Sequence, residues 1–191
     1  MLNKLRKHYY VEKATKYNLK SYQTHVKKYL TLSIVSICIG GIGFFASAIL
    51  GGLVDLAILF ALPFCFLFLI IGVIGATYNY FCLLGIKECK KIIKQINKEI
   101  VFIKDLNYDN FQDSNYLLSI VRNLTKSENL NQYKLFNNIF LYPSNVELDE
   151  KLIYKNNRLL KFHIENNKVV IEHCPNCNHE LYYDEDKCQY C

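Results

Sequence analysis

Two long uncharged runs dominate the pattern of hydrophobic and polar positions along the chain. They cover residues 30–50 and 56–86, and only the short segment 51–55 separates them. A helix needs about 20 consecutive apolar residues to cross the hydrocarbon core of a bilayer, and each run is long enough. The pattern therefore predicts a two-helix transmembrane hairpin at residues 29–86, with its spans at 30–50 and 56–84.

Small residues recur at four-residue intervals in the first span. The positions that carry this spacing are Ser36, Gly40, Gly43, Ser47 and Gly51. Small residues in this register let two helix backbones approach closely. The neighbouring helix is either the second span of the same chain or the hairpin of another copy, so a homo-oligomer is an open alternative.

The segments that flank the spans have helical periodicity. Apolar or aromatic residues at Leu19, Tyr22, Val26 and Tyr29 predict that the basic juxtamembrane segment 1–28 runs as a helix into the first span. After the second span, a heptad-like spacing predicts a helix at residues 87–104 that pairs with the N-terminal helix or forms a coiled coil between subunits. Its apolar positions are Ile86, Cys89, Ile93, Ile96, Ile100 and Ile103.

Lysine and arginine counts orient the hairpin. Residues 1–28 hold eight basic residues against one acidic residue, residues 85–104 hold six against two, and the turn between the spans holds none. Basic flanks stay in the cytoplasm, so we expect an integral two-pass membrane protein with both termini cytoplasmic. No small-residue cleavage site is evident, so we expect no removable signal peptide. The lysines expected to contact lipid head groups are Lys27, Lys28, Lys87 and Lys91.

Residues 105–150 are rich in asparagine, and we expect two short helices there. Asp113 or Ser114 could cap the first, which has Leu117, Ile120, Val121 and Leu124 on one face. The second would cover roughly residues 128–140, and Pro143 would end it. Its apolar side would be Tyr133, Phe136, Ile139 and Phe140.

Residues 151–191 predict a β-hairpin followed by a metal-binding ribbon. Apolar and polar residues alternate on both sides of Asn166-Asn167, a pair suited to a hairpin turn, and the returning strand leads directly to Cys174. Two C-x-x-C knuckles follow, formed by Cys174, Cys177, Cys188 and Cys191. Four thiolates in this arrangement are typical of a closed, structural zinc site. Asn178 stands where a left-handed residue is needed.

The four cysteines allow two interpretations other than zinc. A rubredoxin-type iron centre uses the same ligands, and two disulfides would use the same residues. A reducing cytoplasm disfavours disulfides, so we expect structural Zn²⁺, with iron as the less favoured cofactor. Cys191 ends the sequence, so we expect the second knuckle to hold the metal less firmly than the first.

The remaining motifs do not predict catalysis. No zinc-hydrolase, nucleotide-binding or nucleophile motif is present in the sequence, so we expect no enzymatic activity. His173 and His179 flank the first knuckle, and either could replace a cysteine or support one, but we expect both to be ordinary surface residues.

The charge of the ribbon indicates its kind of partner. Residues 173–191 carry four acidic residues against Lys187, which opposes the basic footprint that nucleic acid requires. We therefore expect a cytoplasmic protein as the partner and do not expect nucleic acid. The candidate contacts are Leu181, Tyr182, Tyr183 and Tyr190, unless these side chains cover the ribbon's own small core.

The fold class that these patterns predict is a membrane α-helical hairpin with a small cytoplasmic α+β region that ends in a zinc ribbon. The paired knuckles resemble those of bacterial zinc-ribbon membrane proteins. The order of parts is similar to the lunapark family of endoplasmic-reticulum proteins, although their Asn-Pro-rich signature is absent and the knuckle spacing here is shorter. The resemblance covers the architecture alone. From the predicted parts themselves we expect a membrane-anchored scaffold or adaptor that presents a cytoplasmic structural zinc ribbon for protein recognition. The alternative is an oligomeric, membrane-perturbing or pore-forming effector regulated by its cytoplasmic domain.

Overall fold

The computed structural model describes residues 2–50, 55–96, 99–106, 114–185 and 187–191. The chain forms two compact units, Met1–Lys91 and Ile92–Cys191. The turn expected at 51–54, the middle of the expected neck at 97–98, the candidate cap Asp113 and the acidic residue at 186 lie outside the described residues.

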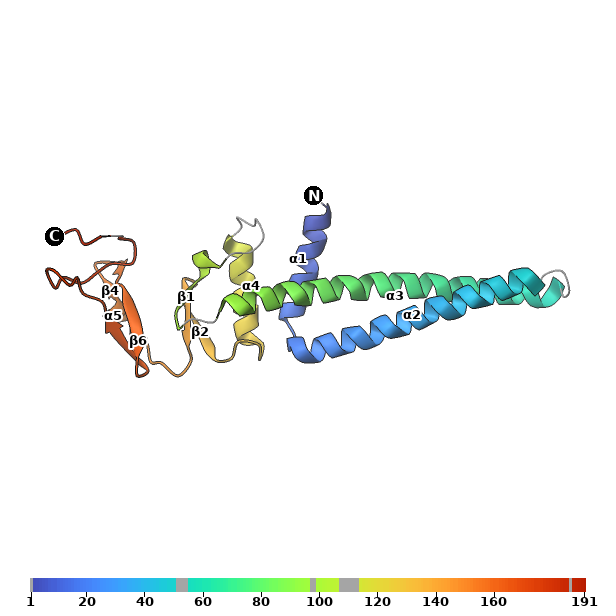
Figure 1. Cartoon of the computed structure of the whole chain (residues 1–191), viewed down its shortest axis with the longest axis horizontal. Coiled ribbons are helices and arrows are strands. Elements are labelled where there is room, and N and C mark those ends of the chain that lie inside the picture. Colours follow the sequence, from blue (N-terminus) through green and yellow to red (C-terminus); the bar gives the residue numbers. More distant parts are fainter. Residues whose placement is uncertain (1, 51–54, 97–98, 107–113, 186) are drawn as a thin grey trace. The chain divides into compact units, whose positions relative to one another are not determined.

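The N-terminal unit contains a short helix and a hairpin of two long helices. These are α1 (Leu2–Thr15), α2 (Leu19–Leu50) and α3 (Asp55–Gln95), and Figure 1 shows α2 and α3 side by side. Leu19–Ser47 and Leu62–Gln95 are long and apolar enough to cross a membrane. Only 6% and 17% of their most apolar windows is buried, so most of the apolar surface faces outward.

Small residues on α2 and α3 bring the two backbones together. A Cβ on Gly40 would lie 2.8 Å from the Cys65 carbonyl oxygen, and one on Gly72 would lie 2.9 Å from the Ser33 carbonyl oxygen. The Ser36 hydroxyl donates across the pair to the Phe68 carbonyl oxygen at 3.1 Å. The small-residue face of the first span is therefore occupied by the second span of the same chain.

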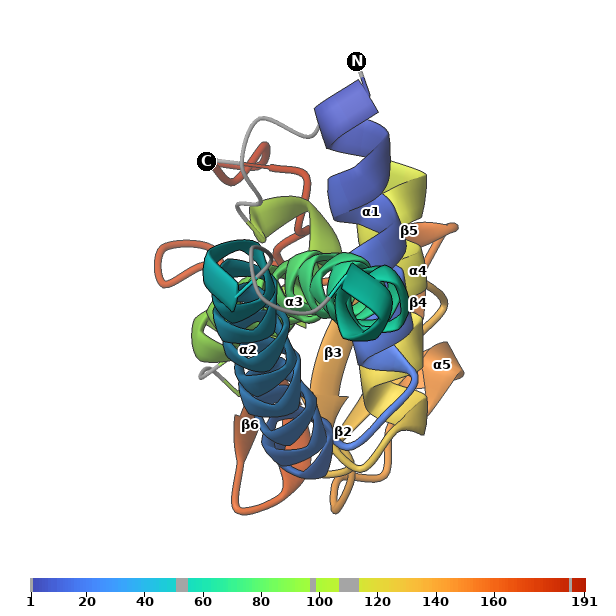
Figure 2. The ribbon, with the colours of Figure 1, turned by 90° about the vertical axis from the view of Figure 1, so that its right-hand side faces the viewer.

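Residues 19–29 run as a helix into the first span, as their periodicity predicted, but the basic segment 1–28 forms two helices and not one. α1 ends at Thr15, and Asn18 caps a new helix because its Oδ1 accepts hydrogen bonds from the amides of Lys20 and Ser21 at 3.1 and 3.3 Å. α1 then crosses α3 instead of following it (Figure 2). Gly85 makes this crossing close, since a Cβ there would lie 2.5 Å from the Tyr10 carbonyl oxygen.

The helix expected at residues 87–104 ends early. α3 stops at Gln95, and the chain continues as strand β1 (Val101–Phe102) and the 3₁₀ helix η1 (Ile103–Asp105). Val101 pairs with Leu141, and Ile103 is buried in the C-terminal unit. The apolar residues near 100 therefore serve a sheet and its core, and the expected coiled-coil pattern does not continue as a helix beyond Gln95.

The second short helix expected at 128–140 is also wrong. Helix α4 (Ser114–Lys126) forms as expected, but β2 (Tyr133–Phe136) and β3 (Phe140–Pro143) follow it and complete an antiparallel sheet of order β1-β3-β2. Asn137 and Asn138 adopt φ values of 43° and 62° between these strands. Two consecutive left-handed residues end a helix and suit a tight hairpin, and asparagine tolerates that conformation.

Two further hairpins complete the C-terminal unit, each with an Asn-Asn turn. The elements are α5 (Glu150–Ile153), β4 (Tyr154–Lys155), β5 (Arg158–Leu159), β6 (Phe162–Glu165) and β7 (Lys168–Ile171). The turns are Asn156-Asn157 and Asn166-Asn167, and all four residues have positive φ. The hairpin predicted around Asn166-Asn167 is confirmed. Phe140, Ile153 and Phe162 form the centre of the core that these strands share with the three-stranded sheet.

We expect Gly40→Val to destabilise the helical hairpin, because the added side chain would force the two backbones apart. Overpacking of this kind lowers the free energy of unfolding by about 1–3 kcal/mol. Equilibrium unfolding in mixed detergent micelles, followed by circular dichroism, measures it. Gly41→Val is the matched control, since a Cβ on Gly41 meets nothing within 4 Å. Equal losses for the two variants would contradict the packing described.

Candidate metal centre

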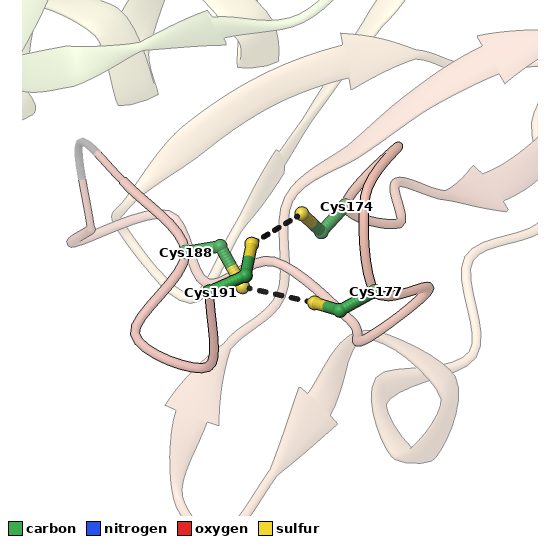
Figure 3. Close-up of side chains that lie close together, drawn as sticks. All are labelled: Cys174, Cys177, Cys188 and Cys191. Atoms are coloured by element: carbon green, nitrogen blue, oxygen red, sulfur yellow. Dashed lines mark hydrogen bonds between the residues drawn. The ribbon is translucent and has the colours of Figure 1, made fainter.

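The first knuckle is held open by its own backbone. The Cys174 amide donates to the His179 carbonyl oxygen at 2.7 Å, and the Asn178 amide donates back to the Cys174 carbonyl oxygen at 2.8 Å. Asn178 has φ 58°, the left-handed conformation predicted for it. This turn directs the Cys174 and Cys177 side chains to the same side of the loop (Figure 3).

The second knuckle places the sulfur atoms of Cys188 and Cys191 next to those of the first knuckle. The sulfur atoms of Cys174 and Cys191 lie 3.4 Å apart, and those of Cys177 and Cys188 lie 3.5 Å apart, with side chains from the two loops pointing toward one another (Figure 3). All four sulfur atoms lie within 4.8 Å of one another. A tetrahedral site with metal–sulfur bonds of about 2.3 Å has sulfur–sulfur edges of about 3.8 Å, so the cluster fits a four-thiolate metal ion.

The four thiols differ in how readily they ionise. Amide groups of Cys177 and Asn176 stabilise the Cys174 thiolate and lower its pKa to about 6. Cys191 lies against the other three sulfur atoms, and these neighbours together with burial raise its pKa to about 12. The pKa of Cys177 is also raised, because burial and the neighbouring thiols outweigh its amide hydrogen bond from His179. A cation at the centre would remove this mutual repulsion.

The ribbon is continuous with the hairpins of the C-terminal unit. The Lys161 amide donates to the Leu181 carbonyl oxygen at 2.7 Å, and the Tyr183 amide donates to that of Leu159 at 2.9 Å. On the other side, the Leu181 amide donates to the Glu172 carbonyl oxygen at 3.0 Å. The segment between the knuckles thus forms part of the same β structure, so binding of a metal at the cysteines would be coupled to the folding of this unit.

Three of the four acidic residues of the ribbon, Glu180, Asp184 and Glu185, pair with basic residues of the same unit. Glu180 lies 2.6 Å from Lys155, and Arg158 contacts Asp184 at 2.9 Å and Glu185 at 2.6 Å. The Arg158 guanidinium holds the pKa of Asp184 below its ordinary value. The sequence did not suggest Lys155 or Arg158, because the pairs join residues about 25 positions apart that only the tertiary fold brings together.

Of the four expected partner contacts, two are engaged in their own unit. Tyr182 is buried, with the Arg158 guanidinium 4.2 Å from its ring centroid. The Tyr183 ring stacks on Phe102 with centroids 3.7 Å apart. Burial, and to a lesser extent the nearby Asp105 carboxylate, raises the pKa of Tyr183 to about 12.

The other two expected contacts are more accessible. Leu181 is half-buried, and Tyr190 is 64% exposed. Tyr190 stacks on His179 with centroids 4.2 Å apart, and the His173 ring nitrogen Nδ1 lies 3.1 Å from the Ile171 carbonyl oxygen. Neither histidine belongs to the cysteine cluster, so these rings support the loops around it.

A groove that sequence patterns did not indicate lies within the C-terminal unit. It has a volume of about 890 Å³. Part of its wall consists of Phe102, Leu106, Leu118, Ile139, Tyr154 and Tyr183. Lys104, Arg158 and Asp184 line it as well. This volume, with apolar walls and a few polar groups, is typical of sites that take a small molecule or an inserted side chain. Its residues come from separate hairpins and α4, so periodicity could not have gathered them.

The lysines expected to contact lipid head groups belong to the N-terminal unit. Lys27, Lys28, Lys87 and Lys91 are all exposed there. Lys91 forms an ion pair with Glu88 at 3.0 Å, so three of these lysines keep their charge free of a described carboxylate partner.

Comparison with known proteins gives no family for this chain. It matches no protein-family model, and no curated protein or solved structure is similar enough to match it.

We expect the purified protein to bind one metal ion per chain through the four clustered thiolates. Replacing any of them by serine, as in Cys177→Ser, removes a soft ligand and should lower the bound metal well below one equivalent. Inductively coupled plasma mass spectrometry measures metal per chain. Cys38→Ser is the control, because Cys38 lies in α2 and outside the cluster. Full metal content in the Cys177→Ser variant would contradict the site.

Metal binding near pH 7 should release protons. Cys177 and Cys191 have pKa values above the ordinary 9.0 without a metal, so both must lose a proton on binding, whereas Cys174 with a pKa of about 6 is already largely ionised. Acidification therefore weakens binding, because protons compete for the thiolates. Calorimetric titration in buffers of different ionisation enthalpy counts the protons. Binding without proton release would contradict this electrostatic description.

Proposed function

We propose that this protein is a membrane-anchored adaptor whose C-terminal unit is a zinc-stabilised module for binding a cytoplasmic protein. The observation that carries the proposal is the convergence of four cysteine sulfur atoms within 4.8 Å. Four thiolates fill a tetrahedral shell and leave no open position for a substrate or water. A metal held in this way stabilises a fold, and it does not supply a reaction centre.

The proposed anchor is the hairpin of α2 and α3. Its outward-facing side chains are largely apolar and include Ile39, Ile42, Phe45, Phe64 and Ile74, each more than half exposed. Contiguous apolar surface of this extent requires a partner or a membrane. The basic segments on both sides of the hairpin support an orientation with both termini in the cytoplasm.

Zinc is the proposed metal on the grounds of chemistry and role. Iron and zinc both accept four thiolates in tetrahedral geometry, so the ligands do not distinguish them. A reducing cytoplasm keeps the thiols available, and the ribbon resembles structural zinc ribbons in its knuckle spacing. The described part of the ribbon has isolated β-bridges in place of longer strands, so a metal would contribute directly to its stability.

The proposed partner is a protein, and the proposed contact surface is the groove together with Tyr190. The groove offers apolar and aromatic walls of a size that suits an inserted side chain, and Tyr190 is an exposed aromatic ring near the cysteines. Nucleic acid is a poorer match. The basic side chains beside the ribbon, Lys155 and Arg158, are already paired with carboxylates and do not form a free basic footprint.

The alternative of a pore-forming effector has less support than the sequence suggested. Its support was the small-residue face of the first span. That face packs on α3 of the same chain through Gly40, Gly43 and Ser36. We therefore give the hairpin the role of an anchor.

Ile139→Glu should weaken capture of the partner, because it places a charge in the apolar wall of the groove and leaves the cysteines intact. Crosslinking and pull-down from native membranes, quantified by mass spectrometry, compares it with the control Leu152→Glu. Leu152 is also an exposed apolar residue of this unit, but it does not line the groove.

A second comparison tests the role of the metal. Cys188→Ser should lose the same co-purifying proteins as Ile139→Glu, whereas Cys38→Ser should keep them. A set of co-purifying proteins that is unchanged in both Ile139→Glu and Cys188→Ser would rule out this module as the recognition element.

A further inference from the structure

We propose that α1 and the adjoining ends of α2 and α3 form a binding surface for the head groups of anionic phospholipids, named here the basic collar. The collar consists of α1 with the exposed lysines Lys20, Lys27, Lys28 and Lys87. This inference rests on the proposed membrane anchor and adds to it a lipid class that the anchor recognises.

The first argument is the way in which α1 is fixed on the hairpin. Tyr10 meets Gly85 through its backbone and stacks on the Phe81 ring with centroids 5.4 Å apart. Val11 and Ala14 are completely buried. The glycine at the crossing point and the buried apolar side chains of α1 indicate that α1 packs tightly across α3 (Figures 1 and 2). If α3 crosses a bilayer, a helix that lies across it follows the membrane surface.

The second argument is the balance of charge at the level of α1. Glu12 pairs with Lys16 at 3.7 Å, and Glu88 pairs with Lys91 at 3.0 Å. No carboxylate of the described residues pairs with Lys20, Lys27, Lys28 or Lys87. Internal pairing thus uses the acidic groups, and a set of exposed cations is left over. Such a set attracts an anionic surface.

The third argument is where these lysines lie along the hairpin. The Lys90 ammonium group donates to the Gln23 side chain, and Tyr22 donates to the Cys82 sulfur at 3.4 Å, so residues 20–28 of α2 flank the stretch of α3 on which α1 sits. The exposed aliphatic and phenylalanine side chains of α2 begin at Leu32. Lys28 stands four residues away, about 6 Å along a helix, and the head-group layer is about 5–7 Å thick on each side.

The fourth argument is the aromatic side chains at the same level. Tyr9, Tyr29 and Tyr80 are each more than half exposed, and Tyr78 contacts Tyr10 and Lys13 of α1. Tyrosine is enriched where a membrane meets water, because its ring suits the apolar side and its hydroxyl suits the polar side. Lys27, Lys28, Tyr29 and the first exposed apolar residues of α2 therefore lie within a few residues of one another, which favours a bilayer surface over a soluble anion.

Lipid selectivity of the full-length protein in vesicles tests the collar. The protein is reconstituted in phosphatidylcholine that contains trace spin-labelled phosphatidylglycerol or phosphatidylcholine, and electron paramagnetic resonance gives the relative association of the two lipids. We expect phosphatidylglycerol to be preferred by about fivefold or more, and the preference to fall as salt is added. Replacing Lys20, Lys27, Lys28 and Lys87 together by glutamine should bring the ratio near one.

The matched control removes four exposed lysines from the C-terminal unit, namely Lys126, Lys134, Lys151 and Lys168. This variant loses as much positive charge as the collar variant but keeps the collar lysines. It should therefore keep the preference for phosphatidylglycerol. Gly85→Val, which displaces α1, should lower the ratio, whereas Gly41→Val should not.

Each remaining outcome counts against a definite claim. A ratio near one for the unmodified protein, or equal ratios for the two quadruple variants, would overturn the collar alone. Loss of the protein from the vesicles after an alkaline carbonate wash would overturn the membrane anchor and, with it, the collar. Release of the bound lipid by free glycerol phosphate would overturn the assignment to a bilayer surface.

Discussion

The apolar surface that α2 and α3 leave uncovered is the constraint on which the rest of the structure depends. A large apolar side chain gains about 1.5–3 kcal/mol when it leaves water, and the two helices use little of their surface against each other. Glycines such as Gly40 and Gly72 let the two backbones pack closely, and the exposed side chains around them are largely apolar. An apolar surrounding medium would therefore stabilise the hairpin, and the flanking chain carries most of the charged groups.

Sequence patterns predicted the elements whose signals are local. The long uncharged runs became α2 and α3, and the Asn166-Asn167 hairpin formed where alternation placed it. The helix expected at 128–140 failed because apolar residues at that spacing fit strands equally well. The deciding signal was Asn137-Asn138, a second pair of the same kind that was available in the sequence. The neck helix failed because Val101 pairs with a strand forty residues later.

The cysteine cluster could be predicted because C-x-x-C spacing itself constrains where the sulfur atoms lie, and the four sulfur atoms do converge. The charge around it could not be predicted in the same way. A local count gave an acidic ribbon, but Lys155 and Arg158 reach Glu180 and Asp184 from a separate hairpin. Net charge over a short window therefore does not reveal which carboxylates are paired with basic residues from elsewhere in the unit. The groove was missed for the same reason, since its wall is assembled from several elements.

The three Asn-Asn turns have a consequence for the order in which the C-terminal unit folds. Each turn closes a hairpin whose paired strands are neighbours in the sequence, and contacts of this kind form in about 1–10 μs. The bridge between Leu160 and Tyr182 spans a much longer loop and is slower to close. That slow contact fixes the segment between the two knuckles on the hairpins. The hairpins can therefore form before it closes, and a metal held by the four cysteines would bind at this last, least local step.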